Sequence, residues 1–136
     1  MKCNITINGD VSRHQFHKRA DIEHITLIDT KKIDDYAFLR CYFLKSIVLP
    51  ETINEIGFGI FRKCYNLRTV NIPKSLKELK PETFYGCQSL EHIEIPYGIE
   101  KIPDECFCKC GKLKSIIIPE SVKVISNSAF QECENL

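Results

Sequence analysis

The strongest constraint on this chain is a leucine that returns at a fixed interval. The leucines of this column, which lie 23 residues apart, are Leu44, Leu67, Leu90, Leu113 and Leu136. Three further columns keep the same step, and they are the prolines at 50, 73, 96 and 119, the phenylalanines at 61, 84, 107 and 130, and the cysteines at 64, 87, 110 and 133. A period in the twenties is typical of a solenoid, in which each coil buries its apolar face only against the next coil. The spacing therefore predicts a repeat protein.

The repeated unit reads L-x-x-I-x-I/L-P-x-x-I/L/V-x-x-I/L-x-x-x-x-F-x-x-C-x-x, and it is clearest between Leu90 and Cys110. This motif resembles the BspA-type leucine-rich repeat, also called the Treponema pallidum-type repeat. The resemblance implies a leucine-rich-repeat solenoid that binds a macromolecule. It also implies a kind of protein, because such repeats occur in surface and adhesion proteins of host-associated microbes and anaerobic protists.

The motif divides the chain into three parts. Residues 44–136 contain four close copies of the unit, and residues 21–43 form a degenerate first repeat in which Ile28 replaces the proline. Residues 1–20 are predicted to be an N-terminal cap, because Ile5 and Ile7 alternate like a strand and Phe16 could pack on the first repeat. The last residue, Leu136, begins another unit, so we expect the repeats to be truncated there.

Within one repeat, residues 44–49 read as a short strand that Pro50 closes, since proline cannot continue a ladder. The apolar pair Ile53 and Ile56 predicts a second short strand. Phe61 and Cys64 are three residues apart and would share a face of a helical or 3₁₀ turn. The predicted fold is a repeat β-solenoid with short parallel strands and one such turn in each 23-residue coil.

Composition and charge exclude several classes of partner. The chain is 43% hydrophobic and 27% charged with a net charge of +1, which fits one soluble domain. A balance so close to neutral predicts no nucleic-acid partner, since phosphate binding needs a concentrated positive field. No apolar run approaches the roughly 18 residues that span a bilayer, and the first residues lack the apolar region of a secretory signal, so we expect no membrane insertion.

The eight cysteines follow the repeat rather than a disulfide framework. Five of them occupy one column, and Cys106 takes the small-residue position of Ala37 and Ala129. Stacked rungs lie about 4.8 Å apart with parallel side chains, which disfavours pairing. We expect buried free thiols, with at most Cys3 and Cys108 open to labelling. Free thiols favour a cytoplasmic location, whereas the family resemblance allows the cell surface.

No residue pattern points to catalysis or to a cofactor. The chain lacks the G-x-S-x-G, H-E-x-x-H, Walker and dinucleotide motifs. Cys106, Cys108 and Cys110 are dense enough to suggest zinc, but no second pair stands at a finger-like spacing. His14 and His17 lie in a basic segment that reads as a solvated loop. We therefore predict a protein that is not an enzyme, with no metal and no cofactor.

The outward positions of the first strands are the predicted partner-binding surface, and the partner is expected to be a protein. They vary while the core does not, and Val48 and Ile117 leave apolar side chains on a face that solubility alone would make polar. The predicted partner-binding residues are Lys45, Val48, Arg68, Asn71, Glu91, His92, Glu94, Lys114 and Ile117. Asn54, Lys77 and Lys123, on the second strands, are expected to take no part. An ordinary solvated face and self-association through the open C-terminal coil are the alternatives.

Overall fold

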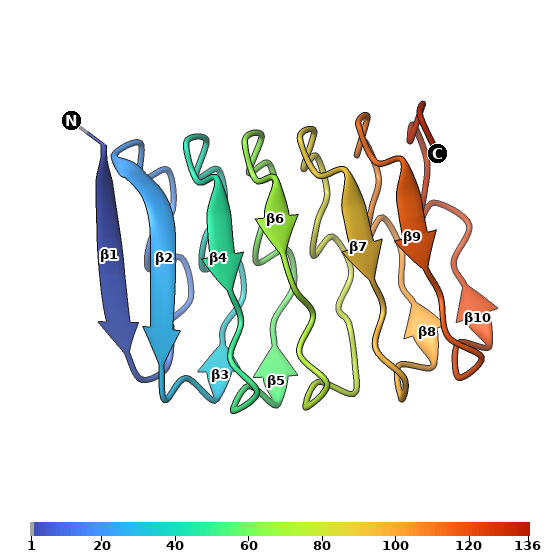
Figure 1. Cartoon of the computed structure of the whole chain (residues 1–136), viewed down its shortest axis with the longest axis horizontal. Coiled ribbons are helices and arrows are strands. Elements are labelled where there is room, and N and C mark those ends of the chain that lie inside the picture. Colours follow the sequence, from blue (N-terminus) through green and yellow to red (C-terminus); the bar gives the residue numbers. More distant parts are fainter. Residues whose placement is uncertain (1) are drawn as a thin grey trace.

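The computed structural model describes residues 2–136 and shows a parallel β-solenoid, which confirms the predicted fold class (Figure 1). We number the coils by residues 3–20, 21–43, 44–66, 67–89, 90–112 and 113–136. Each coil is built from up to three segments, which are a front strand, a second strand and a turn arm. The front strands are β1 (Cys3–Asn8), β2 (Ile22–Ile28), β4 (Ser46–Val48), β6 (Thr69–Val70), β7 (His92–Glu94) and β9 (Ser115–Ile117). The second strands are β3 (Lys32–Ile33), β5 (Glu55–Ile56), β8 (Lys101–Ile102) and β10 (Val124–Ile125).

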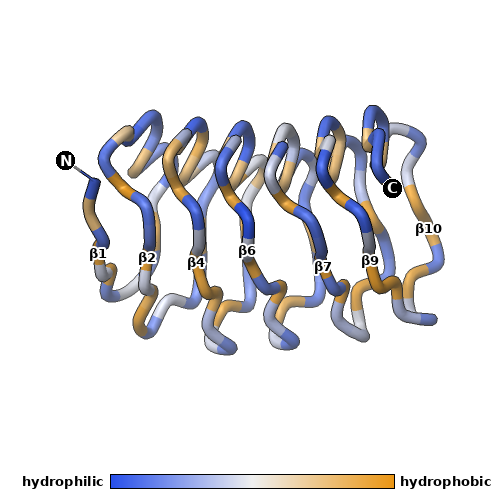
Figure 2. The backbone as a smooth tube through the Cα atoms, turned by 45° about the horizontal axis from the view of Figure 1, so that its top comes forward, coloured by the Kyte–Doolittle hydropathy of each residue, from blue (hydrophilic) through white to orange (hydrophobic). Residues whose placement is uncertain are grey.

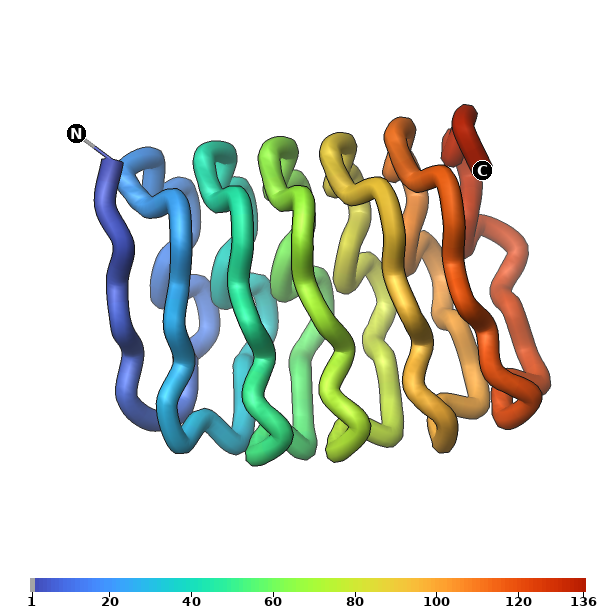
Figure 3. The backbone as a smooth tube through the Cα atoms, in the orientation of Figure 1, coloured from blue at the N-terminus to red at the C-terminus, as the bar shows by residue number. Residues whose placement is uncertain are grey.

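The front strands form because apolar and polar residues alternate in them. In the third coil Ile47 and Leu49 are buried, and Val48 between them is 69% exposed. Strands β1, β2, β4 and β6 make one parallel sheet in that order, and β7 and β9 make a separate two-stranded sheet. The second strands pair as β3 with β5 and β8 with β10. Both sheets are therefore interrupted at the fourth coil, although the coils continue in an even stack (Figure 3).

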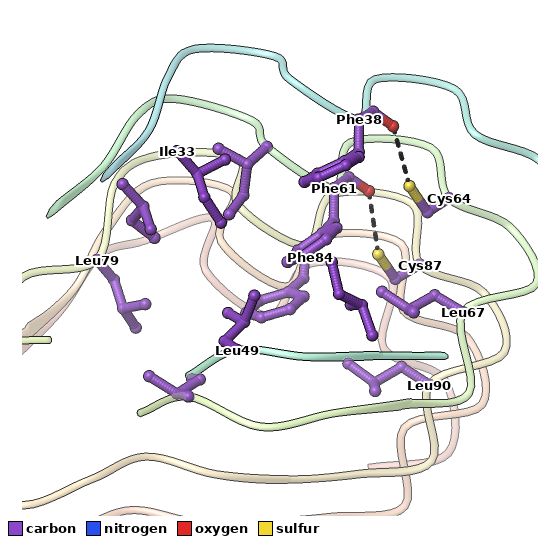
Figure 4. Close-up of a cluster of buried hydrophobic side chains, with 14 of the residues drawn as sticks. Ile33, Phe38, Leu49, Phe61, Cys64, Leu67, Leu79, Phe84, Cys87 and Leu90 are labelled. Atoms are coloured by element: carbon purple, nitrogen blue, oxygen red, sulfur yellow. Dashed lines mark hydrogen bonds between the residues drawn. The ribbon is translucent and has the colours of Figure 1, made fainter. Parts of the chain in front are cut away.

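A column of stacked phenylalanine rings fills the core. The rings of Phe38 and Phe61 have centroids 5.6 Å apart, and those of Phe84 and Phe107 are 5.2 Å apart. Figure 4 shows Phe38, Phe61 and Phe84 above one another, with aliphatic side chains packed around them. Because each ring is buried between the coils before and after it, the core is continuous along the stack and no single coil contains a core of its own.

The turn arms return the chain from the second strand to the next front strand, and they correct one sequence prediction. They span residues 12–19, 34–41, 57–64, 80–87, 103–110 and 126–133, and residues 2–136 contain no α-helical or 3₁₀ segment. Each arm is a run of β-turns, as in the bonds from the N–H groups of Leu39 and Cys41 to the carbonyls of Tyr36 and Phe38. Tyr36 and Arg40 adopt left-handed φ angles of 55° and 59°, which a helix would not contain.

The reason for this conformation is a third ladder of hydrogen bonds between coils, which joins the turn arms and which we call the arm ladder. Alternate N–H groups of one arm donate to carbonyls of the next arm, as from Phe38 to Ile60 at 3.0 Å and from Phe61 to Thr83 at 3.0 Å. A helix would consume these N–H groups within its own coil. The ladder also connects the fourth coil to the fifth, for example from Phe84 to Cys106 at 2.9 Å. The arms therefore hold the stack together where both sheets are interrupted.

The cysteine column has a defined role in the same arms. The Sγ of Cys64 donates to the carbonyl oxygen of Phe38 at 3.2 Å, and the Sγ of Cys87 donates to that of Phe61 at 3.2 Å (Figure 4). Equivalent bonds recur at Cys41, Cys110 and Cys133. The thiol is small enough for this site and supplies a weak donor, which an alanine would lack. Burial raises the pKa of the Cys64 thiol well above its ordinary value, so the thiol stays protonated and able to donate.

Two cysteines differ from their predicted exposure. Cys108 was expected to be open to labelling, but it is only 3% exposed, and burial raises its pKa. It occupies the arm position held by Arg62 and Tyr85 in earlier coils, where a short side chain cannot extend to solvent as a long one does. Cys133, in the last coil, is half-buried because no later coil covers it.

The two ends of the stack are unlike. Residues 3–20, predicted to be a cap, follow the path of one more coil, since β1 pairs with β2 and Phe16 stacks on Phe38 at 5.6 Å. Phe16 is 9% exposed. In the last coil, by contrast, Ile125 is 49% exposed although its counterpart Ile102 is fully buried, and β10 is hydrophobic along its length (Figure 2).

Candidate functional site

All nine residues predicted to bind a partner are exposed on or beside the front strands. Some of their charges are already paired across neighbouring strands. The Nζ of Lys45 lies 3.5 Å from Oε1 of Glu23, and the Nζ of Lys114 lies 3.7 Å from Oε2 of Glu91. Ion pairs at such exposed positions contribute little to stability and are easily exchanged for a partner's charges.

Arg68 and Glu94 differ from these lysines because their charges are uncompensated. Within the described chain, neither side chain has an ion-pair partner within 4.0 Å. Arg68 precedes β6 and Glu94 ends β7, so one uncompensated charge stands on each side of the interruption in the front sheet. The neighbouring His92 is held in place, since its Nδ1 lies 2.6 Å from the Oγ of Ser115.

Asn71 marks the point where the front sheet begins to come apart. In the fifth coil the N–H of Ile95 donates to the backbone carbonyl of Ile117 at 2.9 Å. At the equivalent position in the third coil, the N–H of Leu49 donates instead to the side-chain Oδ1 of Asn71 at 2.8 Å, and the Asn71 amide donates to the carbonyl of Leu49 at 2.8 Å. The Asn71 side chain thus replaces its own backbone in the ladder. Asn71 therefore has a structural role in addition to its predicted role in binding.

A groove lies between the fourth and fifth coils at this interruption. It has a volume of about 690 Å³, and Val70, Ile72, Ile93 and Pro96 give it apolar walls. Its polar lining residues are Asn71, Lys74, Lys77, His92, Glu94 and Tyr97. A second hollow of about 460 Å³ continues beside it along Arg68, Thr69 and Glu91. Five of the nine predicted residues therefore border one continuous depression, which we call the β6–β7 groove.

Sequence reasoning missed part of this groove. Tyr97, which is 76% exposed, follows the proline column and belongs to no predicted strand. The sequence predicts that Lys77 lies on the second strands, away from the binding face, yet it lines the groove with Glu94. The positions of Tyr97 and Lys77 in the groove follow from the loss of strand pairing at the fourth coil, which opens the region between the front strands and the second strands. The one signal in the sequence was Asn71, an amide in a column that otherwise holds Thr26, Val48, Glu94 and Ile117.

Other kinds of site have less support in the structure. Residues 2–136 contain no group of three or more His, Cys, Asp or Glu side chains placed to hold a metal ion. In the Cys106 to Cys110 run, burial raises the pKa of Cys106 and Cys110, whereas a metal ligand would have to be a thiolate. No helix within the described part of the chain is long and apolar enough to cross a bilayer.

Comparison with known proteins gives a match over nearly the whole chain. A family model described as the BspA type leucine rich repeat region matches residues 9–136 in six copies. The match begins within the segment predicted to be the cap. No curated protein matches the chain at a significant level.

Several solved structures have the same fold. The leucine-rich repeat protein of T. pallidum, TpLRR, superposes with a TM-score of 0.82 at 24% identity over 93% of this chain and 71% of its own. A leucine-rich repeat protein from Eubacterium ventriosum gives 0.78 at 20% identity, over 92% of this chain and 42% of its own. A leucine rich cell surface protein from Faecalibacterium prausnitzii gives 0.64 at 21% identity, over 96% and 58%. The chain thus spans less than two thirds of the last two relatives.

Proposed function

Because the chain belongs to the BspA-type leucine-rich repeat family, we propose that it is a non-enzymatic binding module whose front face takes a protein partner at the β6–β7 groove. The observation that carries this proposal is the groove itself. It places the half-buried Val70, together with the buried walls formed by Ile72 and Ile93, between two uncompensated charges, Arg68 and Glu94. Buried apolar contacts surrounded by charged residues are the usual composition of a protein interface.

The exposed apolar side chains around the groove support the same surface. Val48 is 69% exposed, Ile117 is 51% exposed and Tyr97 is 76% exposed. Tyr97 lines the groove, and Val48 and Ile117 lie on β4 and β9, the strands that pair with β6 and β7. Tyrosine in particular contributes large contact area to interfaces at a low entropic cost. Surface adhesion would be the biological form of this binding, as the F. prausnitzii relative is described as a cell surface protein.

The proposal can be tested with a photo-crosslinking amino acid placed at Tyr97 in cells that produce the protein. A matched probe at Asn54, which is exposed beside the second strand β5, serves as the control. We expect one discrete adduct from position 97 and none from position 54. Replacing Arg68, Glu94 and Ile117 with Ala should then weaken binding of the identified partner by about tenfold or more. The same change at Asn54, Lys101 and Lys123 should not.

Two outcomes would contradict the proposal. Equal adducts from positions 54 and 97 would mean that the front face is not preferred. Equal loss of binding in both triple variants would mean that the charges act through the general field of the protein and not through the groove.

A second candidate function is end-to-end association of solenoids. Ile125 and Leu136 are each about half exposed on the last coil, whereas their counterparts Ile102 and Leu113 inside the stack are fully buried. Such surface on unpaired parallel strands favours association with a further coil. Sedimentation velocity over a range of concentrations would detect it without any ligand. An Ile125→Lys variant should abolish the effect, and a monomer at all concentrations would exclude it.

A further inference from the structure

One position in the turn arms carries a positive charge in most coils. It lies two residues after each arm phenylalanine and holds Lys18, Arg40, Lys63, Gly86, Lys109 and Glu132 in successive coils. Their N–H groups belong to the arm ladder, as in the bonds from Lys18 to Leu39 at 2.9 Å and from Arg40 to Arg62 at 2.9 Å. The basic side chains therefore form one row with one position in each coil. Positions in adjacent coils are roughly 4.8 Å apart. We call Lys18, Arg40, Arg62, Lys63 and Lys109 the basic ridge.

The backbone at this position does not explain the choice of lysine and arginine. Lys18, Arg40, Lys63 and Lys109 have φ angles between 59° and 61°, in the left-handed region that disfavours residues with a Cβ. Gly86 takes the same conformation in the fourth coil with φ 73°. Glycine is the residue that the turn itself prefers. Glu132 takes this conformation in the last coil with φ 59°, so the turn accepts side chains of either charge and does not dictate the basic residues at the other four positions.

The ridge is only partly neutralised within the protein. Glu82 pairs with Arg62 at 2.7 Å, and Glu132 lies 3.9 Å from Lys109. In the described chain no carboxylate lies within 4.0 Å of the charged groups of Lys18, Arg40 or Lys63. The buried Nε of Arg40 also has no hydrogen-bond partner among residues 2–136.

The lysine at the centre of the row, Lys63, has three other basic side chains close enough to act on its charge. The pKa of Lys63 is lowered, first by partial loss of solvent and then by the charges of Arg62, Arg40 and Lys109. A ligand with a row of negative groups would relieve the repulsion between these charges. The net charge of +1 for the whole chain hides this local concentration, because acidic residues elsewhere offset it.

The aromatic residues beside the ridge narrow the class of ligand. The ring of Tyr85 is covered by the guanidinium of Arg62 at 4.4 Å and approached by the Nζ of Lys109 at 5.7 Å. The ring of Tyr36 packs against His14 in a tilted arrangement, with ring centroids 5.5 Å apart. Single-stranded nucleic acids need free aromatic faces for their bases. A polymer that offers charge without bases fits this surface better.

We propose that the basic ridge is a second binding site, for a linear sulfated polysaccharide. Sulfate groups along such a chain accept charge-assisted hydrogen bonds from successive arginine and lysine side chains. The site lies on the turn arms, whereas the proposed protein site lies on the front face. The two proposals therefore stand or fall separately.

Heparin is the probe for the test, and its affinity is measured by titration calorimetry at several salt concentrations. The Arg40→Gln/Lys63→Gln double variant should bind on the order of tenfold or more weakly, with a smaller salt dependence. Lys31→Gln/Lys101→Gln is the matched control, because it removes the same charge from exposed positions off the ridge. It should bind heparin as the wild type does, and so should Arg68→Ala. Lys18→Gln, at an exposed position, provides a single variant if the double variant unfolds.

Three results would overturn the proposal. The first is no heparin binding by the wild type at physiological salt. The second is equal weakening in the ridge and control variants, which would indicate general charge attraction. The third is equally tight binding of desulfated heparin or of single-stranded DNA, since either would mean that sulfate is not what the ridge recognises.

Discussion

The Sγ of Cys64 lies 3.2 Å from the carbonyl oxygen of Phe38, and this carbonyl also accepts the N–H of Cys41 at 3.1 Å. The carbonyl thus bonds to its own coil and to the next one at once. The repetition of this arrangement explains why cysteine, and not another small residue, recurs with the period of the fold.

The first prediction follows from this bond. Cys64→Ala should lower the free energy of unfolding by about 1–2 kcal/mol, because it removes a buried hydrogen bond and leaves a small cavity. Cys106→Ala is the control, since it places alanine where Ala37 and Ala129 stand in other coils. Urea denaturation of both variants provides the measurement. A larger loss for Cys106→Ala than for Cys64→Ala would count against a role for the thiol as donor.

Buried thiols also predict a dependence of stability on pH. Burial raises the pKa of Cys41 from its ordinary 9.0 to about 12 in the folded chain. Between these values the unfolded state loses the proton while the folded state keeps it, so stability is complete below about pH 9 and falls as the pH rises toward 12. The urea midpoint should decrease over this range, and less steeply in Cys41→Ala. An identical slope in the variant would mean that other groups cause the loss.

Gly57 should tolerate no side chain. A Cβ at this position would overlap Asp35, with only 2.8 Å to its Cα and less to its Oδ1, which accepts the N–H of Phe58. Gly57→Ala should therefore cost about 2 kcal/mol or more. Gly111→Ala is its control, because nothing lies within 4 Å of a Cβ built there. Thermal unfolding of both variants would decide, and equal melting temperatures would contradict the packing at Asp35.

Asn71 should contribute to both stability and binding. Asn71→Ala removes two hydrogen bonds to Leu49 and should lower the free energy of unfolding by about 1–2 kcal/mol. Asn54→Ala, also at an exposed position, should change it by less than about 0.5 kcal/mol. Chemical denaturation distinguishes the two. If they are equally stable, the amide does not support the edge of the sheet.

Hydrogen exchange should be fastest at the C-terminal end of the second sheet. The N–H of Ser126 donates to Ile102 at 3.0 Å, but Val124 and Ile125 around it are half exposed, so local opening costs little there. The equivalent N–H of Gly57, which donates to Ile33 at 2.8 Å, lies inside the stack and should exchange far more slowly. Slower exchange at Ser126 than at Gly57 in a monomer would contradict an open last coil.

Much of the fold was readable from the sequence because the core is periodic. The columns of Leu67, Phe61 and Cys64 each mark a side chain that points inward, and these three residues inside the stack are fully buried. The turn arm was not readable, because the positions of Phe61 and Cys64 fit a helical turn as well as a run of β-turns. What separates these two conformations is whether backbone N–H groups bond within a coil or between coils, and side-chain spacing does not record that.

The candidate site was only partly predictable for a related reason. Alternation along the strands placed His92 and Glu94 on the exposed face correctly. The β6–β7 groove arises where pairing fails, and a repeat pattern describes what is common to the coils and not where one of them departs. The basic ridge was hidden for the same reason, since Lys18, Arg40 and Lys63 stand in a column whose backbone conformation was unknown.

The arm ladder has an electrical consequence for the stack as a whole. The peptide between Ala37 and Phe38 accepts from Phe16 on one side and donates to Ile60 on the other, so successive peptide dipoles point the same way along the solenoid. Aligned dipoles of this kind sum as they do in a helix, with the partial negative end at the first coil and the positive end at the last. Arg13 and Lys18 lie at the negative end, and Glu132 and Glu134 lie at the positive end. The solenoid is therefore polar along its axis, and any further coil or second copy that joins it should do so head to tail.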